Sequence, residues 1–376
     1  MVRLFLCGLL VFGGACLRAE TLKSEALAYA LSTRYAPNAN WASVVELEAL
    51  ADREVSRYWR PAATIQSARA EDALPLVGLH LAIDPGHIGG RWAAYEWRDF
   101  AVAEGDFRVR EGELVLEVAQ RVRAQLQALG AKVTLVRETY EPVNPKPPTD
   151  YLERALAELP LPKGASLAEL LDHGHAVQFR AIQMAIIEAE LVERARLVNE
   201  VIQPDALISL HINAAPWPEG EAPRLQLVDS NHVHVLIFGC LSDKELSSPR
   251  QQASMLTKLT NGSGEEERLL GRALGAALAE TTTLPPSKYW GTNAVLLDPD
   301  ASTVWARNLL LLRMVECPTV LLEPHVANSK VAYARIQKAL ATRAEGAKPD
   351  SDDILVEYAD AVVAGVLGRY RSDFGE

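Results

Sequence analysis

The sequence predicts an α/β fold, in which a twisted, mixed and mostly parallel β-sheet carries helices on both faces within a single main domain. Short apolar runs of strand length occur at residues 79–83, 132–136 and 206–210. Helical patterns separate them, at 113–129 and 181–202. Strands that alternate with helices in this way form sheets that are covered on both faces.

The size and composition of the chain agree with this class. Of its 376 residues, 49% are hydrophobic and 23% are charged. Such a chain can bury one large core or two modest ones, and it is too apolar to remain disordered. No internal repeat is visible, so we expect a globular enzyme-like domain and not a repeat array.

The strand–helix–strand order begins near residue 76. Before it, residues 20–60 have apolar side chains at helical spacing, and Arg60-Pro61 ends that unit. The strand at 79–83 is broken by Asp84-Pro85-Gly86, and Gly130 ends the helix at 113–129.

Residues 141–180 interrupt the alternation and are interpreted as an insertion. It contains a proline-rich part and a helical segment at 151–171. The pattern then resumes, and a polar stretch at 242–264 separates its later elements. These are strands at 233–238 and 319–322 and helices at 266–280, 304–313 and 354–370.

The N-terminus has the layout of a secretory signal, because the cation Arg3 precedes an apolar run at 4–15. We expect a signal peptide at 1–19, and prefer cleavage after Ala19 to a lipid anchor at Cys16 or a buried N-terminal helix. A helical N-terminal region at 20–75 and the main domain at 76–370 follow. No later stretch is apolar enough to cross a bilayer, so the expected location is the periplasm or the extracellular space.

The chain is acidic, since 38 Lys and Arg stand against 49 Asp and Glu for a net charge of −11. Loss of Arg3 and Arg18 with the signal peptide would make the net charge −13. An acidic chain is a poor nucleic-acid binder, and it must recognise any anionic polymer through local contacts. Outside the signal, Cys240 and Cys317 lie in apolar runs, and a disulfide and two buried thiols both remain open.

Three candidate functional residues directly follow predicted strands or strand-breaking turns: His87, His211 and Glu323. In open α/β sheets, ligands bind outside the carboxyl ends of the strands. Each residue has an ordinary alternative, which is a surface or core histidine for the first two and a structural salt bridge for Glu323. Together, however, two histidines and a glutamate are a familiar zinc-binding set in hydrolases, with a further glutamate free to handle protons.

Four motifs in chain order resemble the zinc-dependent N-acetylmuramoyl-L-alanine amidases (amidase type 3 catalytic domain), which strip stem peptides from peptidoglycan. The resemblance runs from about residue 78 to 336. The similar residues are 83–90; Glu111 with Leu116 and Ala119; Arg194 and Asn199 with 209–214; and 318–323 with Asn328 and Ser329.

The resemblance implies that His87, Glu111 and His211 hold zinc (Zn2+) and that Glu323 is the general base. Glu113 is the rival for the second ligand; Glu111 is preferred because its spacing to the following helix matches the family. The implied reaction is hydrolysis of the amide between the lactyl group of N-acetylmuramic acid and L-alanine, with zinc-activated water as nucleophile. Asp84 either orients His87 or caps the turn.

Two alternatives remain open: a zinc peptidase that cuts within the stem peptide, and a non-catalytic peptidoglycan-binding protein on the same fold. Two departures from the family pattern also stand. His325 follows Glu323 closely in the sequence. It is interpreted either as a hydrogen-bonding wall residue of the site or as a fourth metal contact. The insertion at 141–180 is interpreted as a lid, a substrate wall or a docking surface for an activating protein partner, and an inhibitory block by Glu188, Glu190 or Glu193 is a further hypothesis.

Other polar and aromatic residues have weaker functional interpretations. His173 and His175 flank a loop-like segment with Asp172, where a solvated loop is preferred to a metal site. His232 and His234 share one face of a strand, which suits bidentate metal capture, but strand-edge polarity is preferred. Four aromatic residues near the motifs suit either substrate stacking or packing: Trp92, Tyr95, Trp97 and Trp217.

Overall fold

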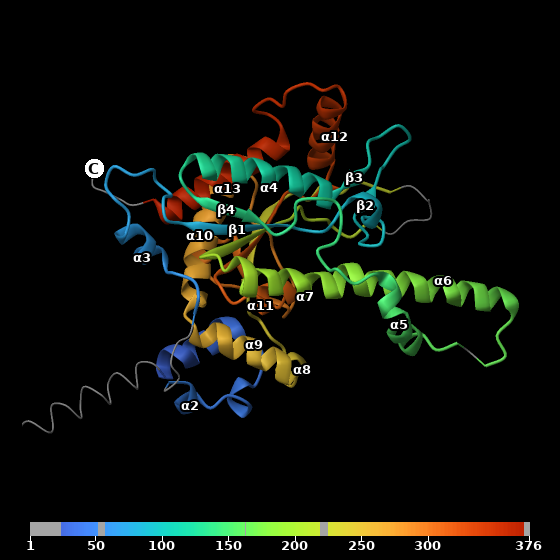
Figure 1. Ribbon diagram of the computed structural model, residues 1–376, viewed down its shortest axis with the longest axis horizontal. Helices are drawn as coiled ribbons and strands as arrows, with labels where there is room; N and C mark the ends of the chain where they lie inside the picture. Colours follow the sequence, from blue (N-terminus) through green and yellow to red (C-terminus); the bar gives the residue numbers. More distant parts are fainter. Residues whose placement is uncertain (1–23, 52–56, 162, 219–224, 372–376) are drawn as a thin grey trace, which may run out of the picture.

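The computed structural model describes residues 24–51, 57–161, 163–218 and 225–371. The expected signal peptide, its cleavage after Ala19 and the lipid anchor at Cys16 therefore lie outside the described residues. A seven-stranded sheet occupies the centre of the molecule, in the order β4-β1-β5-β9-β6-β8-β7 (Figure 1). Its strands are β1 (His80–Pro85), β4 (Lys132–Leu135), β5 (Ala206–Leu210), β6 (Val233–Phe238), β7 (Ala294–Leu296), β8 (Val304–Arg307) and β9 (Thr319–Pro324). A separate small ribbon pairs β2 (Asp99–Phe100) with β3 (Val109–Arg110).

The sheet is mixed and mostly parallel, as predicted. Strands β4, β1, β5 and β9 run parallel to one another. Strand β6 is antiparallel to β9, β8 is parallel to β6, and β7 is antiparallel to β8. The carboxyl ends of β1, β5 and β9 therefore lie at the same edge of the sheet, where ligands collect in open α/β folds.

Helices cover both faces of the sheet, with α4 and α13 on one side and α7 and α11 on the other (Figure 1). They are α2 (Leu47–Ala51), α3 (Ala62–Ser67), α4 (Glu111–Ala128), α5 (Leu152–Glu158), α6 (Leu167–Gln183), α7 (Ala189–Arg196), α8 (Asp243–Leu246), α9 (Pro249–Thr260), α10 (Ser263–Thr282), α11 (Leu310–Met314), α12 (Lys330–Ala344) and α13 (Ile354–Tyr370). None of these helices is long and apolar enough to span a bilayer.

The strands are apolar on both faces because each face is packed. On β1, Leu81 and Ile83 enter the core that α4, α10, α12 and α13 share, whereas Ala82 faces the opposite layer. This alternation is the two-residue period of a strand. Residues 31–50 of the N-terminal region pack against the face of the sheet opposite α4 and α13, through Leu31 and Tyr35. This region therefore shares a hydrophobic core with the sheet.

Two predicted helices are wrong in extent. Residues 304–313, predicted as a helix, form strand β8 followed by the short helix α11, because β8 pairs in register with β6 and alternates buried and half-buried side chains. The helix predicted at 151–171 is divided, since α5 ends at Glu158 and α6 begins only at Leu167. Ser166 caps α6 with a reciprocal Ser–Glu hydrogen-bond pair.

Three further helices lie where none was predicted. The polar stretch at 242–264 contains α8 and α9, and α12 follows β9. Cys240 and Cys317 are both buried and free, so the thiol alternative is the one that the structure adopts.

Candidate metal centre

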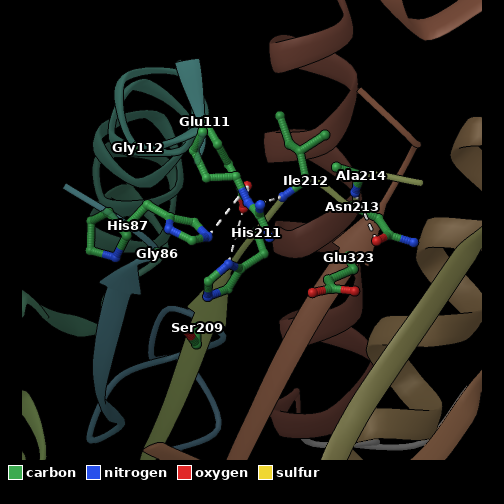
Figure 2. A network of polar contacts seen from close by, with 12 residues as sticks. Gly86, His87, Glu111, Gly112, Ser209, His211, Ile212, Asn213, Ala214 and Glu323 are labelled. Atoms are coloured by element: carbon green, nitrogen blue, oxygen red, sulfur yellow. Dashed lines mark hydrogen bonds and ion pairs between the residues drawn. The ribbon is translucent and has the colours of Figure 1, made fainter. Parts of the chain in front are cut away.

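Three side chains meet at the carboxyl edge of β1 and β5. His87 follows β1, Glu111 is the first residue of α4, and His211 directly follows β5. Strands β1 and β5 are parallel neighbours, with Pro85 opposite Leu210, so the two histidines emerge side by side. One candidate ligand atom from each residue lies within 4.8 Å of the others. Figure 2 shows the three side chains turned toward one another.

Two glycines make this close meeting sterically feasible. A Cβ on Gly86 would lie 2.3 Å from Cε1 of His211, so the ring occupies the space that any larger residue would fill. A Cβ on Gly112 would lie 2.5 Å from the backbone nitrogen of Gly89. The first turn of α4 can therefore press against the turn that carries His87, which places Glu111 beside both imidazoles.

The His87 turn is strained and is held by two buried arginines. His87 has a φ of 50°, a left-handed conformation that costs roughly 1–2 kcal/mol for a non-glycine residue. Arg194 donates to the carbonyls of Pro85 and His87 and pairs with Asp84 at 3.0 Å. Arg137 donates to the Pro85 and Gly86 carbonyls and reaches Gly112 at 3.0 Å. Asp84 thus supports His87 indirectly, by holding Arg194.

A buried carboxylate fixes the orientation of the His87 ring. Nδ1 of His87 lies 3.2 Å from Oε1 of Glu96, and the other oxygen of Glu96 accepts the Ile88 N–H at 2.9 Å. Nε2 of His87 consequently faces Glu111, 3.4 Å from its Oε2. A histidine whose second ring nitrogen is held by a carboxylate is the usual arrangement around a metal ion.

Glu111 is an anion surrounded by donors. Its Oε1 contacts Nδ1 of His211 at 3.0 Å and accepts the Ile212 N–H at 3.1 Å. Its Oε2 lies 2.9 Å from Nε of Arg98. Burial by itself raises the pKa of Glu111, but His87, His211 and Arg98 outweigh it and lower the pKa to about 2.

These residues fit a divalent transition metal. Two imidazoles and one carboxylate are nitrogen and oxygen donors that such ions accept, and three protein ligands leave coordination positions open. Within the described part of the chain, this is the only group of three or more such donors gathered this closely. Glu113 is outside the group: it accepts the Gly90 N–H at 3.0 Å and pairs with Arg110.

Glu323 lies on β9, the strand next to β5, and its carboxylate is placed beside the three candidate ligands (Figure 2). Its side chain is 20% exposed and accepts a hydrogen bond from His234. Burial by itself raises the pKa of Glu323, but the hydrogen bond and charge of His234, with the charge of His211, keep the pKa below its ordinary value.

Three other histidines make contacts away from the candidate ligands. His325 is buried with a φ of 66°, and its Nε2 lies 3.3 Å from Oε1 of Glu357 on α13, so it does not join the three candidate ligands. His173 and His175 lie within helix α6, so the expectation of a solvated loop there is wrong; Nε2 of His173 lies 2.6 Å from the carbonyl oxygen of Leu159, the residue that follows α5. His232 is held by Asn213 and by Ser230.

The expectation of strand-edge polarity for His232 and His234 is wrong for His234. Strand β6 lies between β9 and β8, so it is not an edge strand. The His234 side chain is only 3% exposed and is bound to Glu323. No periodicity marks this pairing, because it depends on the register of two strands that are distant in sequence.

The insertion extends away from the sheet on α6 (Figure 1) and packs at its C-terminal end on the segment that follows His87. Phe179 contacts the Tyr95 ring at a centroid distance of 5.4 Å. The three glutamates of the blocking hypothesis are paired elsewhere, with Arg154 and Arg180 for Glu188, Arg194 for Glu190 and Arg196 for Glu193.

The four aromatic residues near the motifs have different surroundings. Trp92 donates to Glu141 at 3.1 Å, Trp217 packs edge-on against Phe100, and Trp97 is 66% exposed. Sequence patterns did not reveal Glu96, Arg98 or Arg137, since each acts through a contact that only the folded chain creates.

Comparison with known proteins identifies the family. A profile of the N-acetylmuramoyl-L-alanine amidases matches residues 81–344, and no curated protein matches the sequence. Similar solved structures include the amidase Ami1 from Mycobacterium smegmatis, at 19% identity over 78% of this chain and 98% of that chain with a TM-score of 0.40. Another is the CwlD amidase from Clostridioides difficile in complex with the GerS lipoprotein, at 13% identity over 77% and 96% with a TM-score of 0.40. Because the family profile covers well over half of the chain, including all three ligand candidates and Glu323, this protein belongs to the N-acetylmuramoyl-L-alanine amidase family.

Proposed function

We propose that this chain is a zinc-dependent amidase in which His87, Glu111 and His211 hold the metal and Glu323 is the general base. The observation that carries the proposal is the close group of two imidazoles and one buried carboxylate, with a second carboxylate beside it. When bound there, zinc supplies Lewis acidity that activates water and polarises the scissile carbonyl near neutral pH.

The remaining steps fall to the chain's own residues. Glu323 takes a proton from the attacking water and delivers it to the amine of L-alanine as the C–N bond breaks. A C–O bond forms at the lactyl carbonyl, so the products are a free lactyl carboxylate on N-acetylmuramic acid and a peptide that begins with L-alanine. The lowered pKa of Glu323 supports this role, because the base must be ionised before it can accept a proton.

The substrate places the reaction outside the cytoplasm. Peptidoglycan is the polymer on which the family acts, and we infer a periplasmic or extracellular location from it. The solved CwlD amidase is bound to the GerS lipoprotein. For the present chain, the exposed surface of α6, which carries Leu167 at 74% exposure, is one part of the insertion that a protein partner could reach.

Digestion of purified peptidoglycan tests the proposal. We expect new N-terminal L-alanine, and loss of the activity on addition of a chelator with recovery on adding zinc. New ends within the stem peptide would instead identify a peptidase. Binding without any new ends, in a preparation that contains zinc, would identify a non-catalytic protein.

Three variants separate the roles of the carboxylates. Glu323→Gln should retain zinc and lose about 10²–10⁴-fold in kcat, the usual contribution of general acid–base catalysis. Glu111→Gln should lose zinc, whereas Glu113→Gln should retain it. Zinc loss in Glu113→Gln with retention in Glu111→Gln would reverse the ligand assignment.

A further inference from the structure

We propose that His234 is a positioning residue for Glu323, which holds one carboxylate oxygen so that the other faces the reacting amide. The proposal rests on the proposed function, since it assigns a partner to the general base. Strands β6 and β9 are antiparallel neighbours in which His234 lies directly opposite Glu323. Directly paired residues project from the same face of a sheet, so the register itself brings imidazole and carboxylate together.

The surroundings of the ring show that this contact is its principal polar interaction. His234 is 2% exposed, and its Nε2 hydrogen-bonds Oε2 of Glu323. The same nitrogen lies 3.2 Å from the hydroxyl of Tyr289. Its Nδ1 is buried and has no hydrogen-bond partner among the described residues.

The contact gives the carboxylate a directed donor. The Nε2–H of His234 donates to Oε2 of Glu323. His234 therefore holds one oxygen of Glu323, and the other oxygen is left to accept the proton.

The pair is surrounded by other ionisable groups that influence the same carboxylate. His234 also stacks on His232 at a centroid distance of 5.7 Å. The groups that act electrostatically on Glu323 or on its partners are His211, Glu111, His232, Tyr289, Arg307 and Tyr358. A His234 variant leaves the identity of these groups unchanged; of them, Tyr289 and His232 contact the His234 ring.

The test compares His234→Leu with His234→Gln, which keeps an N–H donor. Loss of the donor makes the Glu323 anion harder to form, so the acid limb of kcat/KM should move to higher pH by about one unit in His234→Leu. We expect kcat to fall roughly tenfold with little change in KM, and His234→Gln to restore the limb. His80→Gln is the matched control, because His80 is a half-buried histidine on β1 that lies 3.0 Å from the neutral Thr134 hydroxyl.

A second measurement needs no activity. In metal-free protein labelled with ¹⁵N-histidine, the Nε2–H of His234, which donates to a carboxylate, should give a low-field proton resonance. That resonance should move upfield in Glu323→Gln and stay unchanged in His80→Gln. It uses the native histidine, so it applies even if His234→Leu does not fold.

The outcomes separate this inference from the function beneath it. If Glu323→Gln keeps wild-type turnover, the proposed function fails. Two results would overturn the role of His234 and leave the amidase assignment standing. In the first, Glu323→Gln is inactive while His234→Leu keeps the wild-type acid limb. In the second, the His234 resonance has the same chemical shift in Glu323→Gln as in the wild type.

Discussion

Replacing Gly86 by alanine should disable the metal centre without unfolding the protein. The backbone φ at Gly86 lies outside the left-handed region, so alanine can adopt the same conformation, and the Gly86 N–H keeps its 2.9 Å bond to Leu210. The added Cβ would lie 2.3 Å from Cε1 and 2.4 Å from Nε2 of His211. Ordinary contacts between such atoms begin at about 3.4 Å, so the His211 ring must move away by about 1 Å.

A retreat of this size exceeds what zinc coordination tolerates. Zinc–nitrogen bonds are about 2.0–2.1 Å long and vary by only about 0.2 Å. The imidazole also cannot shift freely, because its Nδ1 contacts Glu111 at 3.0 Å and its backbone N–H is bonded to Leu322 in β9. We therefore expect zinc affinity to fall by about 100-fold or more, and overpacking to cost roughly 1–3 kcal/mol of stability.

Competition with a chromophoric chelator measures the affinity, and urea denaturation measures the stability. Gly174→Ala is the matched control, because a Cβ at this position of α6 would have no atom within 4 Å. It should bind zinc like the wild type and gain about 0.5–1 kcal/mol of stability. If Gly86→Ala binds zinc within threefold of the wild type, the steric argument for the His211 position is refuted.

Two further predictions concern carboxylates at other positions. Glu96→Gln should weaken zinc binding by about 10–100-fold in chelator competition, because the neutral amide holds the His87 ring less firmly; wild-type affinity would show that Glu96 has no such role. Arg343 bridges Glu117 and Asp353, and although burial raises the pKa of both carboxyls, Arg343 lowers the pKa of each overall. A lowered folded-state pKa contributes stability above the unfolded value near about 4 and loses it as the pH falls through the folded value. Arg343→Met should therefore cost about 2–3 kcal/mol at pH 7 in urea denaturation, with the deficit shrinking toward pH 3, and a deficit independent of pH would contradict this reasoning.

The periodicity of apolar residues was sufficient to predict those strands and helices whose conformation depends on neighbouring residues in the sequence. The apolar runs of β1, β5 and β9 each precede a polar functional residue, and strand–helix alternation predicts that such ends meet at one edge. It failed at residues 304–307, whose strand conformation depends on pairing with β6. It could not distinguish Glu111 from Glu113 either, because both fall in the first turn of α4 and only the resemblance to a family favoured one of them.

What the sequence by itself determined was the fold class, the family and the residues that stand at the strand ends, since these follow from short-range periodicity and ordered motifs. Only the tertiary structure decided what each of those residues touches. Glu111 meets His211 across 100 residues of chain, and Glu323 meets His234 across 89. Such contacts depend on strand order and register, where a shift of one residue would turn His234 to the other face of the sheet and leave the carboxylate without its donor.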